Sequence, residues 1–130
     1  MTTNVEVVRR IQDSISRGQI IEAMSHLARD IRWEVNTMNR EAAPWFKQYR
    51  GRSGVVEFFE ALSQVEMRDF AVKAVVGGGD LVTVWLHLEF ASPSGRSVDM
   101  DEVQIWTFAD GKVQSVDLFP DTLAIANAFA

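Results

Sequence analysis

Residues 99–121, DMDEVQIWTFADGKVQSVDLFPD, predict two β-strands joined by a tight turn. The turn falls at residues 109–112, because the pair Asp110-Gly111 accepts the positive φ angles that a two-residue hairpin loop needs. Apolar side chains mark both arms: Val103, Ile105, Trp106 and Phe108 before the turn, and Val113, Val116, Leu118 and Phe119 after it. Asp121 is then expected to open a short C-terminal helix. We expect this hairpin to line any chemical site that the chain carries.

The composition is that of a globular protein, with 47% hydrophobic and 24% charged residues. A length of 130 residues predicts one domain, 1–130, with a single core. The net charge of −5 disfavours nucleic acid and an anionic membrane surface as partners. The chain has no cysteine and two histidines, so we expect no metal site and no cofactor. The N-terminal residues lack an apolar run, and no stretch is long enough to span a bilayer, which predicts a cytoplasmic protein.

Hydrophobic periodicity predicts helices first and consecutive strands last, which is the order of an α+β fold. The expected helices cover 4–17, 19–29 and 53–64, with Ser53 as an N-cap; the expected strands cover 31–35, 67–76, 81–91 and 97–108. Residues 37–50 have no clean period and are expected to form a loop or a short helical excursion. Such an antiparallel sheet can curl around the helices and leave a cone with one open mouth.

Alternation along residues 81–90 shows which side of this strand faces the core. Val82, Val84, Leu86, Leu88 and Phe90 share one uniformly apolar face and are expected inside. Trp85 and His87 then lie on the outer face, where, with Val103 and Ile105, they predict a homodimer interface. In the next strand both faces are mixed, so periodicity alone does not decide which one faces inward.

Two short motifs resemble the nuclear-transport-factor-2-like superfamily, a cystatin-like fold that includes SnoaL-like polyketide cyclases and ketosteroid isomerases. The first is Tyr49-Arg50-Gly51 followed by Val55-Val56-Glu57-Phe58-Phe59, and the second is the hairpin Trp106-Thr107-Phe108-Ala109-Asp110-Gly111-Lys112-Val113. The resemblance extends over nearly the whole chain in the order of its elements. It implies that Glu102, Gln104, Trp106 and Phe108 point into the cone.

The resemblance also implies which activities to expect. The acid, tyrosine and base of the ketosteroid isomerase pattern would fall at Gln104, near Ile11, and near Val35 or Asn36, so that steroid isomerisation by that mechanism is not expected. SnoaL-like cyclases are more similar at the end of the chain, where an aspartate after the last strand matches Asp121.

Two carboxylates are therefore candidate acid/base catalysts. Asp121 would have its pKa raised at the mouth of an apolar cone, although it is also a well-formed helix N-cap. Glu102 would lie in an apolar pocket if its face is the inner one, and would be solvated otherwise. Gln104 could orient a carbonyl group, or be a buried amide satisfied by its neighbours.

The remaining candidates are apolar and aromatic side chains that would contact a flat hydrophobic ligand. These are Trp33, Trp45, Phe46, Tyr49, Phe59, Leu86, Leu88, Met100, Trp106 and Leu118. Together the candidates predict a cofactor-free acid/base enzyme of isomerase, cyclase or hydrolase type, acting on an apolar carbonyl compound. The alternative is a non-catalytic ligand-binding or dimerisation module with the same fold.

Overall fold

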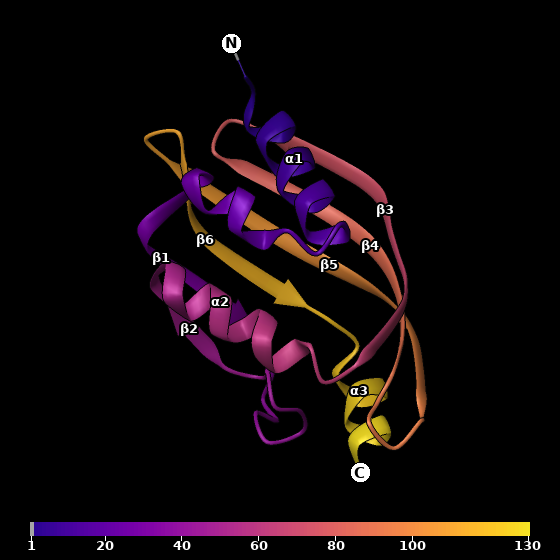
Figure 1. The fold of residues 1–130 in the computed structure, drawn as a ribbon. Coiled ribbons are helices and arrows are strands. Elements are labelled where there is room, and N and C mark those ends of the chain that lie inside the picture. Colours follow the sequence, from indigo (N-terminus) through magenta and orange to yellow (C-terminus); the bar gives the residue numbers. More distant parts are fainter. Residues whose placement is uncertain (1) are drawn as a thin grey trace.

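The fold, seen in a computed structural model that describes residues 2–130, is one curved six-stranded sheet with helices packed on its inner face (Figure 1). The elements in chain order are α1 (Asn4–Ser16), the 3₁₀ helix η1 (Ile20–His26), β1 (Leu27–Val35), β2 (Gln48–Arg50), α2 (Gly51–Leu62), β3 (Glu66–Gly78), β4 (Leu81–Ala91), β5 (Ser97–Ala109), β6 (Lys112–Phe119) and α3 (Thr122–Phe129). The strand order is β2-β1-β6-β5-β4-β3, and the sheet does not close. The predicted α+β class is confirmed, with one parallel pair, β1 and β6, that was not predicted.

The predicted hairpin is present as β5 and β6, which pair antiparallel; the pair next to the turn is Ala109 with Lys112. Asp110 has φ 51° and Gly111 has φ 76°, so both central residues of the turn are left-handed, as a type I′ turn requires. The pairing of β5 with β6 shifts by one residue between Thr107 and Phe108, so the turn sets the register only of the pairs next to it.

Periodicity did not decide which face of β5 points inward, and the inner face is the one that the resemblance implied. Glu102, Gln104, Trp106 and Phe108 are all buried, and Val103 between them is 40% exposed. Glu102 pairs across the sheet with Leu86 of β4, whose side chain is buried on the same face. The chain thus places a carboxylate and an amide among the apolar side chains of the core.

The N-terminal half differs from the sequence prediction in three places. Residues 19–29 are not one α-helix, since η1 ends at His26 and β1 already starts at Leu27. Within the predicted loop 37–50, Gln48–Arg50 forms β2, which pairs antiparallel with β1. The third helix begins at Gly51 rather than Ser53, and its N-cap position is Arg50, without a side-chain cap.

The first and last helices start as predicted. The Thr3 side chain accepts a hydrogen bond from the backbone N–H of Glu6, and Asp121 does the same for Ala124. No helix within residues 2–130 is long and apolar enough to cross a membrane.

Candidate functional site

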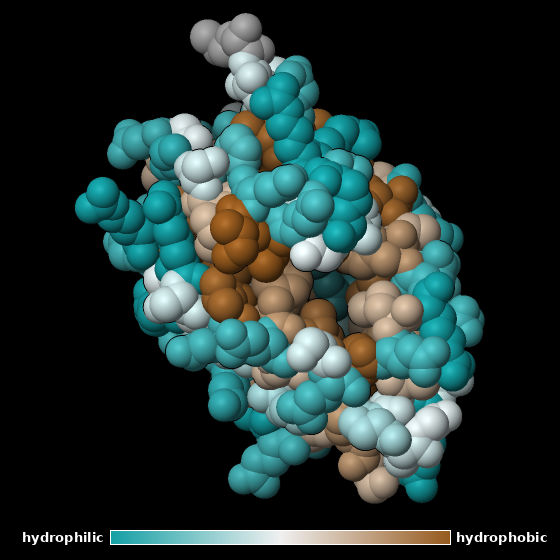
Figure 2. Space-filling view, in the orientation of Figure 1, coloured by the Kyte–Doolittle hydropathy of each residue, from teal (hydrophilic) through white to brown (hydrophobic). Residues whose placement is uncertain are grey.

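A cavity of about 360 Å³ lies between the helices and the inner face of the sheet. Figure 2 shows its opening on the face that carries α1 and α2, rimmed by hydrophobic residues. Most of the lining is apolar, and no Lys, Arg or His of residues 2–130 contributes to it. Its walls therefore suit an apolar molecule, and its few polar atoms decide what chemistry can take place there.

Nine of the side chains predicted from the sequence line this cavity. They are Trp33, Trp45, Phe59, Leu86, Leu88, Met100, Glu102, Gln104 and Leu118. They come from strands β1, β4, β5 and β6, from α2, and from the loop before β2. Residues that are distant in sequence are thus brought to one cavity, because the inner faces of four strands, α2 and the loop before β2 meet around it.

Three predicted aromatic residues support the wall without lining it. Trp106 is fully buried and packs edge-on against Trp33, with ring centroids 5.5 Å apart. Phe46 packs in the same way on Trp45, and the Tyr49 hydroxyl donates to the Trp45 carbonyl at 3.1 Å. These contacts hold the two lining tryptophans in place.

Asp121 is not among the residues that line the cavity, although its neighbour Pro120 is. Its side chain is exposed at the start of α3 and accepts the backbone N–H of Ala124 at 3.0 Å. This is the geometry of a helix N-cap, and the carboxylate does not share the apolar surroundings of the cavity.

A chain of hydrogen bonds connects the polar groups of the site. Gln104 Oε1 accepts from Gln12 Nε2 and from the Trp106 indole Nε1, each at 3.0 Å. Gln104 Nε2 donates in turn to Glu102 Oε2 at 2.7 Å. All four side chains are buried, so the Glu102 carboxyl is held by an amide that is itself held at its other end.

Glu102 is the only titratable side chain among the residues that line the cavity within 2–130. Its exposed fraction is 8%, and burial raises its pKa to about 7, while the hydrogen bond from Gln104 acts in the opposite direction. Near neutral pH both protonation states are therefore populated, as a group that accepts and returns a proton requires.

Gln12 is the buried polar residue of the lining within 2–130 that the sequence prediction missed, together with the exposed Ser16 and Ser63. It lies on α1 beside Ile11, within a helix face whose other large side chains are apolar. The sequence does contain a signal for Gln12, because an amide on the apolar face of a helix is expected to be buried and therefore to need a hydrogen-bond partner. That partner, Gln104, is 92 residues away in the chain.

Two buried polar atoms of the lining residues have no hydrogen-bond partner within residues 2–130. They are Gln12 Oε1, an acceptor, and Trp33 Nε1, a donor. An unpaired buried polar group is unfavourable, so both atoms are available to a bound molecule or to water.

The family model described as SnoaL-like domain matches residues 8–116 of the chain. The chain belongs to the SnoaL-like domain family. A comparison with curated proteins finds no similar sequence. Solved structures of SnoaL-like and NTF2-like proteins, by contrast, share its fold over nearly its whole length.

Three of these structures illustrate the relationship. An NTF2-like protein of unknown function from Burkholderia pseudomallei is 21% identical with a TM-score of 0.88, covering 100% of this chain and 99% of its own. A protein from Jannaschia, provisionally assigned as a SnoaL-like polyketide cyclase, is 26% identical with a TM-score of 0.77, covering 97% and 90%. TerC, co-crystallised with polyporic acid, is 23% identical with a TM-score of 0.84, covering 97% of each chain.

Proposed function

We propose that this SnoaL-like protein binds an apolar, carbonyl-bearing small molecule in its cavity and catalyses a proton transfer through Glu102, without a cofactor. The observation that carries the proposal is a single carboxyl group among the lining residues within 2–130, with its pKa raised to about 7, in a mostly apolar cavity. Such a group is poised to act both as base and as acid at neutral pH.

The proposed step is an enolisation that balances without an external reagent. The ionised Glu102 takes a proton from the carbon next to the carbonyl, and the electron pair of that C–H bond moves to form the enolate. For isomerisation, the protonated carboxyl then returns the proton to another carbon of the conjugated enolate. For ring closure, the enolate carbon instead attacks a second carbonyl of the same molecule, the C=O π bond of that carbonyl breaks, and the protonated carboxyl gives its proton to the alkoxide oxygen that forms. An apolar cavity favours this exchange because it does not stabilise the ionised carboxylate over the neutral one.

Gln104 has a supporting place in this proposal. Its amide forms hydrogen bonds with Gln12, Trp106 and Glu102. These bonds favour a role for Gln104 in orienting the Glu102 carboxyl rather than in binding the substrate carbonyl. Asp121, exposed and used as a helix cap, is the weaker of the two candidate acid/base residues.

The similar structures support a small-molecule function in general terms. One of them is provisionally assigned as a polyketide cyclase, and another was crystallised with polyporic acid. Because this fold carries many activities, Glu102 and its cavity, rather than the fold, support the proposed chemistry.

The test is a pair of carboxylate-to-amide variants, Glu102→Gln and Asp121→Asn. A thermal-shift screen of hydrophobic carbonyl compounds supplies the ligand, since a molecule that binds only the folded protein raises its melting temperature. Proton exchange is then followed by NMR as the loss of the ligand's α-proton signal in D₂O. We expect Glu102→Gln to lower the exchange rate by about 10²-fold or more, and Asp121→Asn to keep it, because asparagine also caps helices. Unchanged exchange in Glu102→Gln would contradict the proposal.

The second candidate is a ligand-binding module without catalysis. It is favoured by the presence of only one titratable side chain in the lining within residues 2–130, whereas many acid/base enzymes use two. The same experiment separates the candidates: a binding module gives a thermal shift that depends on pH through Glu102, but no proton exchange above the rate in buffer.

A further inference from the structure

The direction of the buried hydrogen-bond chain is set by one of its members. An amide can be turned by 180° with little change in shape, so either end of Gln12 or Gln104 could in principle donate. An indole N–H cannot be reversed, because it donates and never accepts. The contact of 3.0 Å between Trp106 Nε1 and the Gln104 amide therefore requires the oxygen of Gln104 on that side.

The rest of the chain follows from this one requirement. With its oxygen toward Trp106, Gln104 turns its NH₂ group to Glu102 Oε2. Gln12, which approaches the same Gln104 oxygen, must donate to it, and its own oxygen is left without a partner within residues 2–130.

We propose that Trp106 is a positioning residue whose indole N–H fixes the direction of both amides, so that Glu102 exchanges its proton with a ligand through Oε1 alone and the Gln12 oxygen is left as an acceptor for the ligand. The inference rests on the proposed role of Glu102 in proton transfer. Oε2 receives the Gln104 N–H in either protonation state, which leaves Oε1 to carry the proton. Oε1 takes part in no hydrogen bond among residues 2–130, so the proton it carries is free for the ligand.

Removing the indole N–H gives Gln104 a second orientation. In Trp106→Phe the amide can turn its oxygen to a protonated Glu102 and its NH₂ group to Gln12 Oε1. That orientation stabilises the neutral carboxyl and ties up its proton, so the pKa of Glu102 should rise, by about 0.5 to 1 unit for one neutral hydrogen bond. Leu86 of β4 is the cross-strand partner of Glu102, Gln12 of α1 bonds to Gln104 beside it, and no second titratable side chain lines the cavity within residues 2–130.

Trp33 supplies a matched control. It is a buried tryptophan that packs against Trp106, but its indole N–H has no partner within residues 2–130. Trp33→Phe therefore deletes the same atoms without releasing an amide. Extra space and water near Glu102 would lower its pKa in both variants, whereas a released Gln104 raises it only in Trp106→Phe.

The experiment follows the side-chain carboxyl ¹³C signal of Glu102 against pH, assigned by its absence in Glu102→Gln. We expect a higher midpoint in Trp106→Phe than in the wild type, and an equal or lower midpoint in Trp33→Phe. A Trp106→Phe midpoint that equals or falls below the wild-type value overturns the inference. The midpoint of Glu102 in the wild type tests the proposed function, and the difference in midpoint between the variants tests the positioning role of Trp106. One of the two proposals can therefore fail while the other holds.

A measurement on the wild type covers the case in which Trp106→Phe does not fold. The indole ¹H–¹⁵N signal of Trp106 is followed over the same pH range. We expect it to shift with the midpoint of Glu102, because the change of charge polarises Gln104 and, through it, the indole N–H. A Trp106 signal that stays constant across the Glu102 transition would overturn the inference.

Discussion

At the scale of single residues, Glu102 links the cavity to the stability of the fold. An unfolded glutamate titrates near 4.5, whereas burial raises the pKa of Glu102 to about 7 in the folded protein. Between these two values the folded state holds a proton that the unfolded state has lost. Stability therefore falls as the pH rises through this window, which is opposite to the usual effect of a carboxylate in an ion pair.

The resulting prediction concerns the free energy of unfolding. The ionised Glu102 costs the folded state on the order of 3 kcal/mol above pH 7, because burial raises its pKa from 4.5 to about 7. Glu102→Gln should therefore gain stability relative to the wild type as the pH rises from 4.5 to 8. Urea unfolding of both proteins at several pH values measures this difference. A difference that is independent of pH would show that Glu102 titrates normally.

Asp121 makes a separate prediction at the same scale, because its carboxylate caps α3. Asp121→Ala should lower the free energy of unfolding by about 1 kcal/mol, and Asp121→Asn should change it by only a few tenths. Urea unfolding at pH 7 distinguishes the two variants. Equal losses in both would mean that the charge of Asp121, rather than its capping oxygen, stabilises the protein.

At the scale of elements, the β3–β4 hairpin is packed against α1 with no room for an added side chain at Gly77. A Cβ atom there would lie 2.9 Å from the Leu81 carbonyl oxygen and from Val82 Cγ2, and 3.0 Å from Val5 Cγ2 of α1. At Gly78, the next residue, no other atom of residues 2–130, apart from those of Gly78 and its two chain neighbours, lies within 4 Å of the same position. The two neighbouring glycines thus form a natural comparison.

We expect Gly77→Ala to destabilise the protein by about 1 to 3 kcal/mol, as overpacking does. Gly78→Ala should change the free energy of unfolding by less than about 0.5 kcal/mol, which is usual for an exposed site. Thermal or urea unfolding measures both. Similar values for the two variants would indicate that α1 moves away from the hairpin at little cost.

The elements also show what sequence patterns can predict. The strands β4 and β5 and the turn at Asp110-Gly111 were predicted because alternation and turn chemistry are local properties. Gln48–Arg50 was not, since a strand of three residues is defined by its pairing with β1 rather than by its own pattern. The prediction of a helix at 19–29 was wrong. Ile20, Ala23 and Leu27 have helical spacing, but Leu27 is the first residue of β1, and its pairing in the sheet is not visible in the local pattern.

The site was predictable in part for the same reason. The family resemblance indicated which face of β5 points inward, and Glu102 and Gln104 lie on that face, so both could be predicted as site residues. The position of Asp121 relative to the cavity and the bond from Gln12 to Gln104 depend on tertiary packing, which no local pattern contains.

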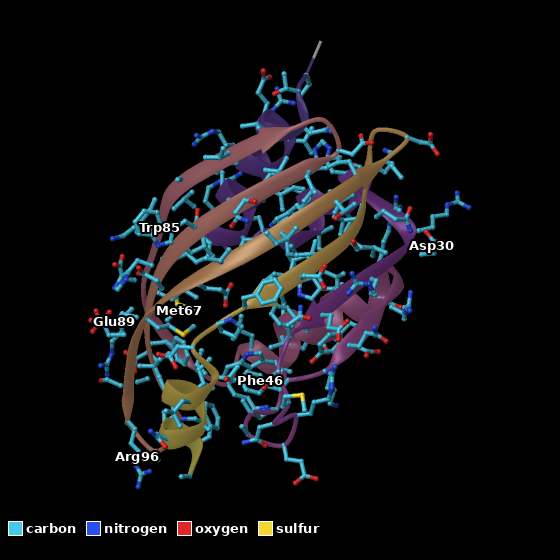
Figure 3. The ribbon with its side chains drawn as sticks, turned by 180° about the vertical axis from the view of Figure 1, so that it is seen from behind. Asp30, Phe46, Met67, Trp85, Glu89 and Arg96 are labelled. Atoms are coloured by element: carbon cyan, nitrogen blue, oxygen red, sulfur yellow. The ribbon has the colours of Figure 1, made fainter. Side chains whose placement is uncertain are left out.

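At the scale of the whole molecule, the outer face of the sheet carries an exposed apolar row. Trp85 of β4, Val103 of β5 and Phe119 of β6 are register partners and are 44%, 40% and 47% exposed. Trp85 lies on the face turned away from α1 and α2 (Figure 3). His87 lies beside this row between Asp99 and Asp101, and the hydrogen bond to Asp101 and the nearby charges raise the pKa of the imidazole.

We propose that a second copy of the chain covers this row, since an apolar row bordered by both signs of charge can pair with itself about a two-fold axis. Light scattering after size exclusion should then give the mass of a dimer for the wild type and of a monomer for Trp85→Glu. Leu123→Glu is the control, because Leu123 is 71% exposed on α3 and is not a member of this row. A monomeric wild type at micromolar concentrations would refute this interface.

The most direct test of the acid/base proposal is the titration of the Glu102 carboxyl in the wild-type protein. Its ¹³C chemical shift, followed from pH 3 to 9, should show one transition with a midpoint near 7. That result would give the cavity a group able to accept and return a proton at neutral pH. A midpoint near the ordinary value of about 4.5 would mean that the carboxyl is solvated and always charged, and would contradict the proposed chemistry.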